Sequence, residues 1–167
     1  MRLLYLMIVM AIGCGPSTKE VQSARDARYR GPAVRIFDIA ETVTKETYKI
    51  AESDPAQLAL ITLPKWYGPD GQSESAGTGD AVIVQDGSLL VALLVRVEAD
   101  AEDIPDPDRE APVKITVTPV VERLHIGQST NEKLAPDDPS MPGWVTGKAE
   151  ALLVSIHARA KEHLIAP

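Results

Sequence analysis

The chain has 167 residues, of which 44% are hydrophobic and 25% charged, so it can bury the core of one ordinary domain and is not disordered by composition. Its formal net charge is −7; one of the 17 basic residues, Arg2, lies within positions 1–13, so the remaining 16 against 24 acidic residues give −8. That balance argues against nucleic-acid binding and against broad adhesion to anionic lipid, because both depend on many Lys and Arg side chains.

The first fourteen residues combine a short basic start, an apolar run and the only cysteine of the chain. Met1-Arg2 precedes the apolar run Leu3–Ile12, which is too short to cross a bilayer as a helix but has the length of a secretory h-region. The run ends in Ala11-Ile12-Gly13-Cys14, which resembles the lipobox of bacterial lipoprotein signal peptides, with Ala11 where Leu is commonest. An ordinary signal peptide with an incidental cysteine, or a buried N-terminal helix, is the alternative.

The lipobox resemblance implies that residues 1–13 are a cleaved signal peptide and that Cys14 carries the lipid. Two or more acyl chains anchor a protein stably, so the membrane becomes a partner through Cys14. By the same resemblance, Gly15 in place of Asp implies sorting to the outer membrane, with the protein facing the periplasm.

Residues 15–32 are polar, carry Gly-Pro at both ends and lack a sustained apolar stripe, which predicts a flexible tether. We therefore expect the lipidated cysteine and tether to span 14–32 and a single domain to span 33–167. Arg25, Arg28 and Arg30 make the tether locally basic; they could contact lipid headgroups or be solvated.

The domain is predicted to begin with a helix, because Val34, Phe37, Ala40 and Val43 recur at spacings of three. We expect this helix to run to about Lys45 and to be followed by a short strand over 47–50 and a turn at 53–55. Residues 58–66 are apolar on both faces and read as one interior strand. The segment 68–80 is rich in Gly, Ser and Asp and is predicted to be a loop.

Two long strands are predicted in the second half of the chain. Asp86-Gly87 is a hairpin signal. It precedes a strand over 89–99 whose buried face should be Val91, Leu93, Val95 and Val97. After an acidic, proline-containing loop over 100–112, alternation predicts a strand from 113 to 122, in which Pro119 suggests an edge or a bulge.

A loop of about twenty residues (124–143) leads to a final helix from about Gly143 to His163. One face of that helix is apolar, with Val145, Ala149, Leu152, Ile156 and Ala160. The element order predicts an α+β fold: a small antiparallel sheet covered on one face by two helices.

This order, with Phe37–Ala40, Tyr48–Ile50, Asp54 and Ile61-Thr62, resembles the helix-grip domain of the BamC-type outer-membrane assembly lipoproteins. The resemblance covers residues 33–164 and rests on positions that mostly report core packing. It implies a helix-grip architecture and a non-enzymatic role, and it assigns a role to no individual residue.

Few residues suggest a site. The acidic loop offers Asp103, Asp106 and Asp108 as a weak calcium alternative, although a solubilising connector is the simpler interpretation. Trp66, Tyr67 and Trp144 form either a partner surface or the rim of the core. His157 and His163 are six residues apart on the last helix, a spacing that does not place two metal ligands on one face. Their neighbours Glu150, Arg159, Lys161 and Glu162 look like a solvated face. No cofactor is expected.

Three functions remain open on this basis. The first is a lipid-anchored envelope protein that acts as a non-catalytic binding or accessory assembly module, with an envelope protein as its partner. The second is a small hydrolase acting on peptidoglycan or another glycan, with its site in the loops 68–80 and 124–143. The third is an accessory protein of lipid or lipopolysaccharide transport. A filled core with an exposed aromatic patch would favour the first, a deep cleft with converging carboxylates or a histidine the second, and a dry apolar groove between helices and sheet the third.

Overall fold

A computed structural model describes residues 15–73, 84–99 and 112–165 of the chain. Its elements are α1 (Thr18–Asp26), α2 (Ala33–Thr47), β1 (Ile50–Asp54), β2 (Ala59–Thr62), β3 (Lys65–Tyr67), β4 (Leu89–Ala99), β5 (Val113–Arg123), β6 (Glu132–Leu134), α3 (Gly143–Arg159) and a 3₁₀ turn, η1 (Lys161–His163). The strands form one antiparallel sheet in the order β1-β2-β4-β5-β6, and β3 pairs with the start of β4. The predicted α+β fold with an antiparallel sheet is confirmed.

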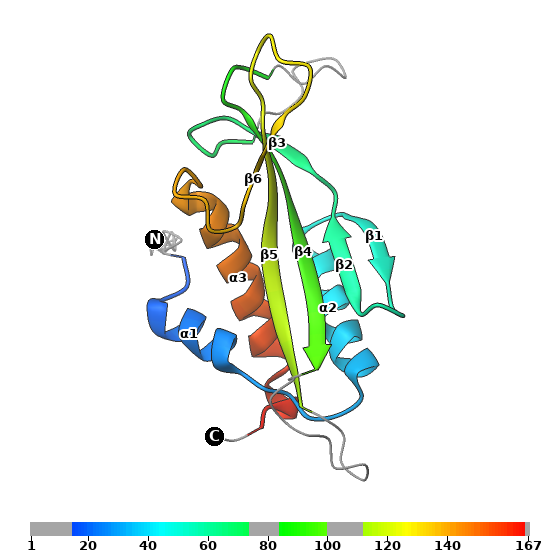
Figure 1. Cartoon of the computed structure of the whole chain (residues 1–167). Helices are drawn as coiled ribbons and strands as arrows, with labels where there is room; N and C mark the ends of the chain where they lie inside the picture. Colours follow the sequence, from blue (N-terminus) through cyan, green and yellow to red (C-terminus); the bar gives the residue numbers. More distant parts are fainter. Residues whose placement is uncertain (1–14, 74–83, 100–111, 166–167) are drawn as a thin grey trace, which may run out of the picture.

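The helices lie on one side of the sheet. Figure 1 shows α2 and α3 packed against the same face, with α1 beside α3. The predicted apolar stripe of the last helix is confirmed, because each of its five residues is at most 4% exposed. On α2 the stripe is displaced: Val34 is 52% exposed, whereas Ile36 and Phe37 are fully buried. The space between helices and sheet is filled mainly by Ile36, Phe37, Leu60, Leu93, Val95 and Ile156.

The expectation of a tether over residues 14–32 is wrong for most of that segment, because α1 is part of the folded domain. Ser17 and Glu20 form a reciprocal capping box at the start of α1. Val21 and Ala24 are 7% and 1% exposed, and the helix packs against α3. Two well-spaced apolar residues are enough here because a nine-residue helix buries only a narrow stripe.

The segment after α1 is also fixed to the domain. Tyr29 exchanges both backbone hydrogen bonds with Val113, at 2.8 and 3.0 Å. The Arg30 N–H donates to the carbonyl of His163, and the Ile165 N–H donates to the carbonyl of Arg28. The domain therefore begins at Ser17, sixteen positions before the predicted start at Ala33.

The strand predicted over 58–66 is two strands. Leu63 and Pro64 separate β2 from β3, and the two short strands pair with different parts of β4. Proline lacks the N–H that a ladder needs, so the segment cannot continue as one interior strand. The strand predicted over 47–50 begins later, at Ile50, because α2 continues to Thr47.

The long strands β4 and β5 match their predicted positions, and they pair along their whole length without a register shift. The predicted buried face of β4, Val91, Leu93, Val95 and Val97, is at most 5% exposed. Pro119 lies opposite Leu93, outside the three residues of β5 that pair with β6, so the edge interpretation is correct at that position. The loop predicted over 124–143 contains β6, and the last helix ends at Arg159. Part of the segment before Asp86-Gly87 lies outside the described residues.

Candidate functional site

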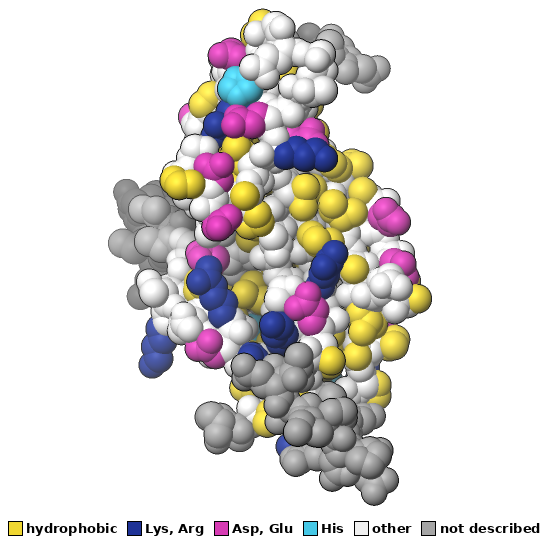
Figure 2. Space-filling model, viewed as in Figure 1, with side chains coloured by type: hydrophobic (Ala, Val, Ile, Leu, Met, Phe, Trp, Pro, Cys, Tyr) yellow, Lys and Arg dark blue, Asp and Glu magenta, His cyan; other side chains and the backbone are white. Residues whose placement is uncertain are grey.

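The face of the sheet opposite the helices is not covered by any other described element. Because successive strand residues point to opposite faces, the register of β4 places Leu90, Ala92, Leu94, Arg96 and Glu98 on the outer face, and of these only Ala92 is buried, at 4% exposed. No helix within the described residues lies on this face, and Figure 2 shows it directly, with apolar side chains gathered over the sheet. We call this surface the open face.

One half of the open face is apolar. The register places Trp66 opposite Leu90, Ile61 opposite Leu94, and Val120 opposite Ala92. Val120 is 41% exposed, and the side chains of Trp66, Leu90, Leu94 and Ile61 are half-buried. An antiparallel sheet with one solvated face normally carries polar residues there, so this apolar half is unusual for a surface that only meets water.

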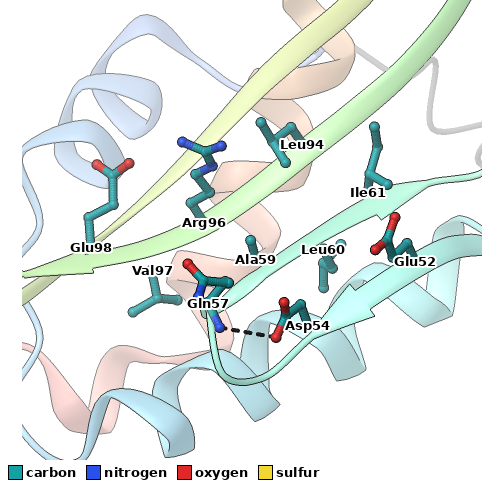
Figure 3. A pocket seen from close by; sticks show the side chains of 10 residues that line it. All are labelled: Glu52, Asp54, Gln57, Ala59, Leu60, Ile61, Leu94, Arg96, Val97 and Glu98. Carbon is teal, nitrogen blue, oxygen red and sulfur yellow. Dashed lines mark hydrogen bonds between the residues drawn. The ribbon is translucent and has the colours of Figure 1, made fainter.

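The other half is charged and hollowed. A hollow of about 460 Å³ lies over β1, β2 and β4. Figure 3 shows Ile61 and Leu94 at one end, with Glu52 beside Ile61, and Asp54, Arg96 and Glu98 along the rest.

Two of the three carboxylates that line this hollow, Asp54 and Glu98, have structural partners. Asp54 accepts hydrogen bonds from the backbone N–H groups of Ala56 and Gln57, at 2.9 and 3.1 Å, which closes the turn between β1 and β2. Glu98 lies 3.9 Å from the Lys114 ammonium group across the β4–β5 pair. The hollow therefore offers an apolar floor and a rim of mixed charge, a combination suited to binding.

The three aromatic residues predicted as a partner surface do not share one surface. Tyr67 is 7% exposed, and its ring packs on Trp144 with centroids 5.2 Å apart, in a second core cluster. Trp66 lies on the opposite face of β3, since neighbouring strand residues alternate. Tyr67 and Trp144 thus belong to the helical side and Trp66 to the open face.

Arg159, Lys161 and Glu162 are exposed, as the solvated face predicted around His157 requires, but His157 itself is buried. His157 is 8% exposed, and its Nδ1 lies 2.9 Å from the hydroxyl of Tyr29, which is fully buried. Burial lowers the pKa of His157, and the nearby Lys161 cation lowers it further. Burial raises the pKa of Tyr29 to about 12. This buried pair connects the segment after α1 to α3, so its role is to stabilise the fold.

The loop predicted over 124–143 carries charged side chains at the surface. His125 Nε2 lies 2.9 Å from Glu132, which also lies 3.3 Å from Arg123. The hydrogen bond from His125 is the main cause of a lowered pKa at Glu132. The side chains of His125 and Glu132 are 34% and 46% exposed, so the group forms an exposed ion-pair cluster at the β5–β6 end.

Several predicted residues lie outside the described part of the chain: Cys14, most of the loop 68–80, and Asp103, Asp106 and Asp108. Within residues 15–73, 84–99 and 112–165, no group of three or more His, Cys, Asp or Glu side chains is placed to hold a metal ion. None of the helices in those same ranges has the length and apolar character needed to span a membrane.

In comparisons with known proteins, no family model and no curated protein sequence matches this chain.

Proposed function

We propose that this chain is a lipid-anchored protein of the cell envelope, facing the periplasm from the outer membrane, and that it binds an envelope protein through the open face without catalysing a reaction. The anchor proposal rests on the apolar run and the lipobox-like Ala11–Cys14. The observation that carries the binding proposal is the apolar half of the open face, with Trp66, Leu94 and Val120.

The chemistry of the open face favours a protein as the partner. Protein interfaces commonly combine an apolar centre with a polar rim, and a tryptophan near the centre often contributes much of the binding energy. The rim here alternates in sign, with Arg96 and Lys114 beside Glu52, Asp54 and Glu98. A nucleic acid or an anionic bilayer would instead favour a predominantly basic surface.

The two alternative functions receive less support from the geometry. A lipid carrier would need an apolar groove between helices and sheet, and that space is filled by buried side chains such as Phe37 and Leu93. For a hydrolase, the described part of the predicted loops offers an exposed His125–Glu132 pair rather than polar groups converging in a cleft.

The proposal is tested by comparing four full-length forms of the protein in cells of a Gram-negative bacterium. These are the wild type, Cys14→Ser, Val120→Asp, and the matched control Val34→Asp, which changes an exposed apolar residue on the helical side. Envelope proteins are crosslinked, the protein is purified, and the mass of its N-terminal peptide and the recovered partner are measured.

We expect the wild type to carry lipid on Cys14 and to recover a partner, and Cys14→Ser to leave the membrane fraction. Val120→Asp should remain lipidated but lose about tenfold or more of the partner, since a charge placed in an apolar interface typically costs a few kcal/mol. Val34→Asp should recover the partner normally. Equal recovery with Val120→Asp and Val34→Asp would refute the binding surface.

A further inference from the structure

The start of the described chain lies against an aromatic cluster on the helical side. Gly15 and Pro16 line a hollow of about 390 Å³ together with Gly71, Trp144, Gly147 and Lys148. Trp144 covers Gly71 so closely that a Cβ atom there would lie 2.9 Å from the indole ring. The Lys148 ammonium group lies 4.7 Å from the centre of the Tyr67 ring and 5.9 Å from that of Trp144. We call the surface made by Pro16, Gly71, Trp144, Gly147 and Lys148 the anchor-side surface.

The folded domain begins very close to the proposed anchor. Only Gly15 and Pro16 separate Cys14 from Ser17, the cap of α1. At roughly 3.3–3.6 Å per residue, the Cα atoms of Cys14 and Ser17 lie within about 11 Å of each other. A flexible tether over 15–32 would instead have had a root-mean-square length of about 23 Å.

That distance is comparable to the membrane's own interfacial layer. The headgroup region on each side of a bilayer is roughly 5–8 Å thick, from the difference between its total and hydrocarbon thickness. A lipidated Cys14 would lie at this layer, so Ser17 and the hollow beside it would lie at the membrane surface.

The anchor-side surface has the chemistry of a membrane interface. Tryptophan and tyrosine favour the headgroup level, where one part of the ring is apolar and the other polar. The Trp144 Nε1–H is buried and has no acceptor among the described residues. Lys148 supplies a cation for lipid phosphates. Asp70 and Glu150 also line the hollow, so electrostatic attraction alone would be weak and the lipid on Cys14 has to hold the surface in place.

We infer, on the basis of the proposed lipid on Cys14, that the anchor-side surface lies against the phospholipid headgroup layer and fixes the orientation of the domain. Gly147 and Lys148 lie on a face of α3 away from its sheet-packing residues Val145 and Ala149, whereas Trp144 packs its ring on Tyr67 of β3 at the edge of that face. The helical side therefore faces the membrane, and the open face points away from it, toward partners in the periplasm.

The test uses the two tryptophans, one on each side of the molecule. The lipidated full-length protein is prepared as Trp66→Phe, which retains Trp144, and as Trp144→Phe, which retains Trp66. Each form is incorporated into vesicles of phosphatidylethanolamine and phosphatidylglycerol that carry a quenching spin label on the headgroup. Flotation of the vesicles reports anchoring separately from quenching.

We expect strong loss of Trp144 emission and little loss of Trp66 emission. A flexible Gly-Ser segment inserted between Gly15 and Pro16 should keep the protein on the vesicles but relieve the quenching of Trp144. If the protein floats and Trp144 is quenched no more than Trp66, the inference is refuted while the anchor stands. If no lipid is found on Cys14 and the protein does not float, the anchor proposal and this inference both fail.

A second probe guards against a tryptophan variant that folds poorly. Because the lipid occupies the Cys14 thiol, Gly147→Cys would introduce the one free thiol of the protein, and a Cβ at Gly147 meets no atom within 4 Å. A nitroxide attached there should be shielded from a water-soluble relaxation agent on vesicles, whereas one at Val120→Cys, a 41% exposed position on the open face, should remain accessible. Equal accessibility at the two positions would refute the inference.

Discussion

At the residue scale, the contact between Tyr29 and His157 joins the segment after α1 to the last helix. Burial lowers the pKa of His157 below the 6.5 of an exposed histidine, so the unfolded chain binds more protons than the folded one as the pH falls below about 6.5. The free energy of unfolding should therefore decrease between pH 6.5 and pH 5, a range above the ordinary glutamate value of 4.5. Above pH 10 it should decrease again, because the pKa of Tyr29 is raised to about 12.

Urea denaturation at a series of pH values measures this dependence, with His157→Gln as the matched variant. The glutamine keeps a polar group near Tyr29 but does not titrate, so the free energy of unfolding of this variant should decrease less between pH 6.5 and pH 5 than that of the wild type. An equal decrease in the wild type and in His157→Gln would contradict the account of this pair.

At the scale of elements, the helix α1 shows that the domain starts with a folded segment where the sequence predicts a flexible tether. Arg25 and Arg28 should resist limited trypsin digestion in the native protein, because α1 packs on α3 and the following backbone is hydrogen-bonded to β5 and to the C-terminal segment. Ala24→Asp buries an unpaired carboxylate at a position that is 1% exposed, which costs about 2 kcal/mol or more and should expose both sites.

The exposed substitution Gln22→Asp is the matched control and should leave both sites protected. The cleavage positions are identified by mass spectrometry of the fragments. Rapid cleavage at Arg25 in the native wild type would show that the segment is a tether after all.

The elements that the sequence predicted well are those whose burial follows a long, regular pattern. The eleven-residue strands β4 and β5 and the stripe of α3 have enough alternating or periodic positions to be located from the hydrophobic pattern alone. Short elements have few such positions. For α1 the available signal was the Ser17–Glu20 capping box rather than hydrophobicity, and β6 has three residues with only Leu134 buried.

At the scale of the whole molecule, the open face could not be predicted, because a continuously apolar strand has the same sequence pattern whether one or both of its faces are covered. Leu90, Ala92 and Leu94 are consistent with an interior strand of a two-sided core. Only the placement of both long helices on one side shows that the second face is uncovered within the described residues. The aromatic residues were likewise divided between two sides by the alternation of β3, which a sequence cluster cannot reveal.

This arrangement gives the domain two functional sides in our account. The helical side carries the start of the chain and faces the anchor, while the open face presents Trp66, Leu94 and Val120 to a partner. An orientation fixed by a two-residue connection would present the open face in one direction instead of allowing it to rotate on a long tether.

The most direct measurement is photo-crosslinking in cells with a crosslinking amino acid at Leu94 on the open face or at Ser155 on α3, which is exposed on the helical side. We predict that position 94 of the lipidated protein forms a discrete adduct with an envelope protein and that position 155 does not. Absence of an adduct at position 94, or the same adducts at both positions, would contradict the claim that this chain is a binding module acting through its open face.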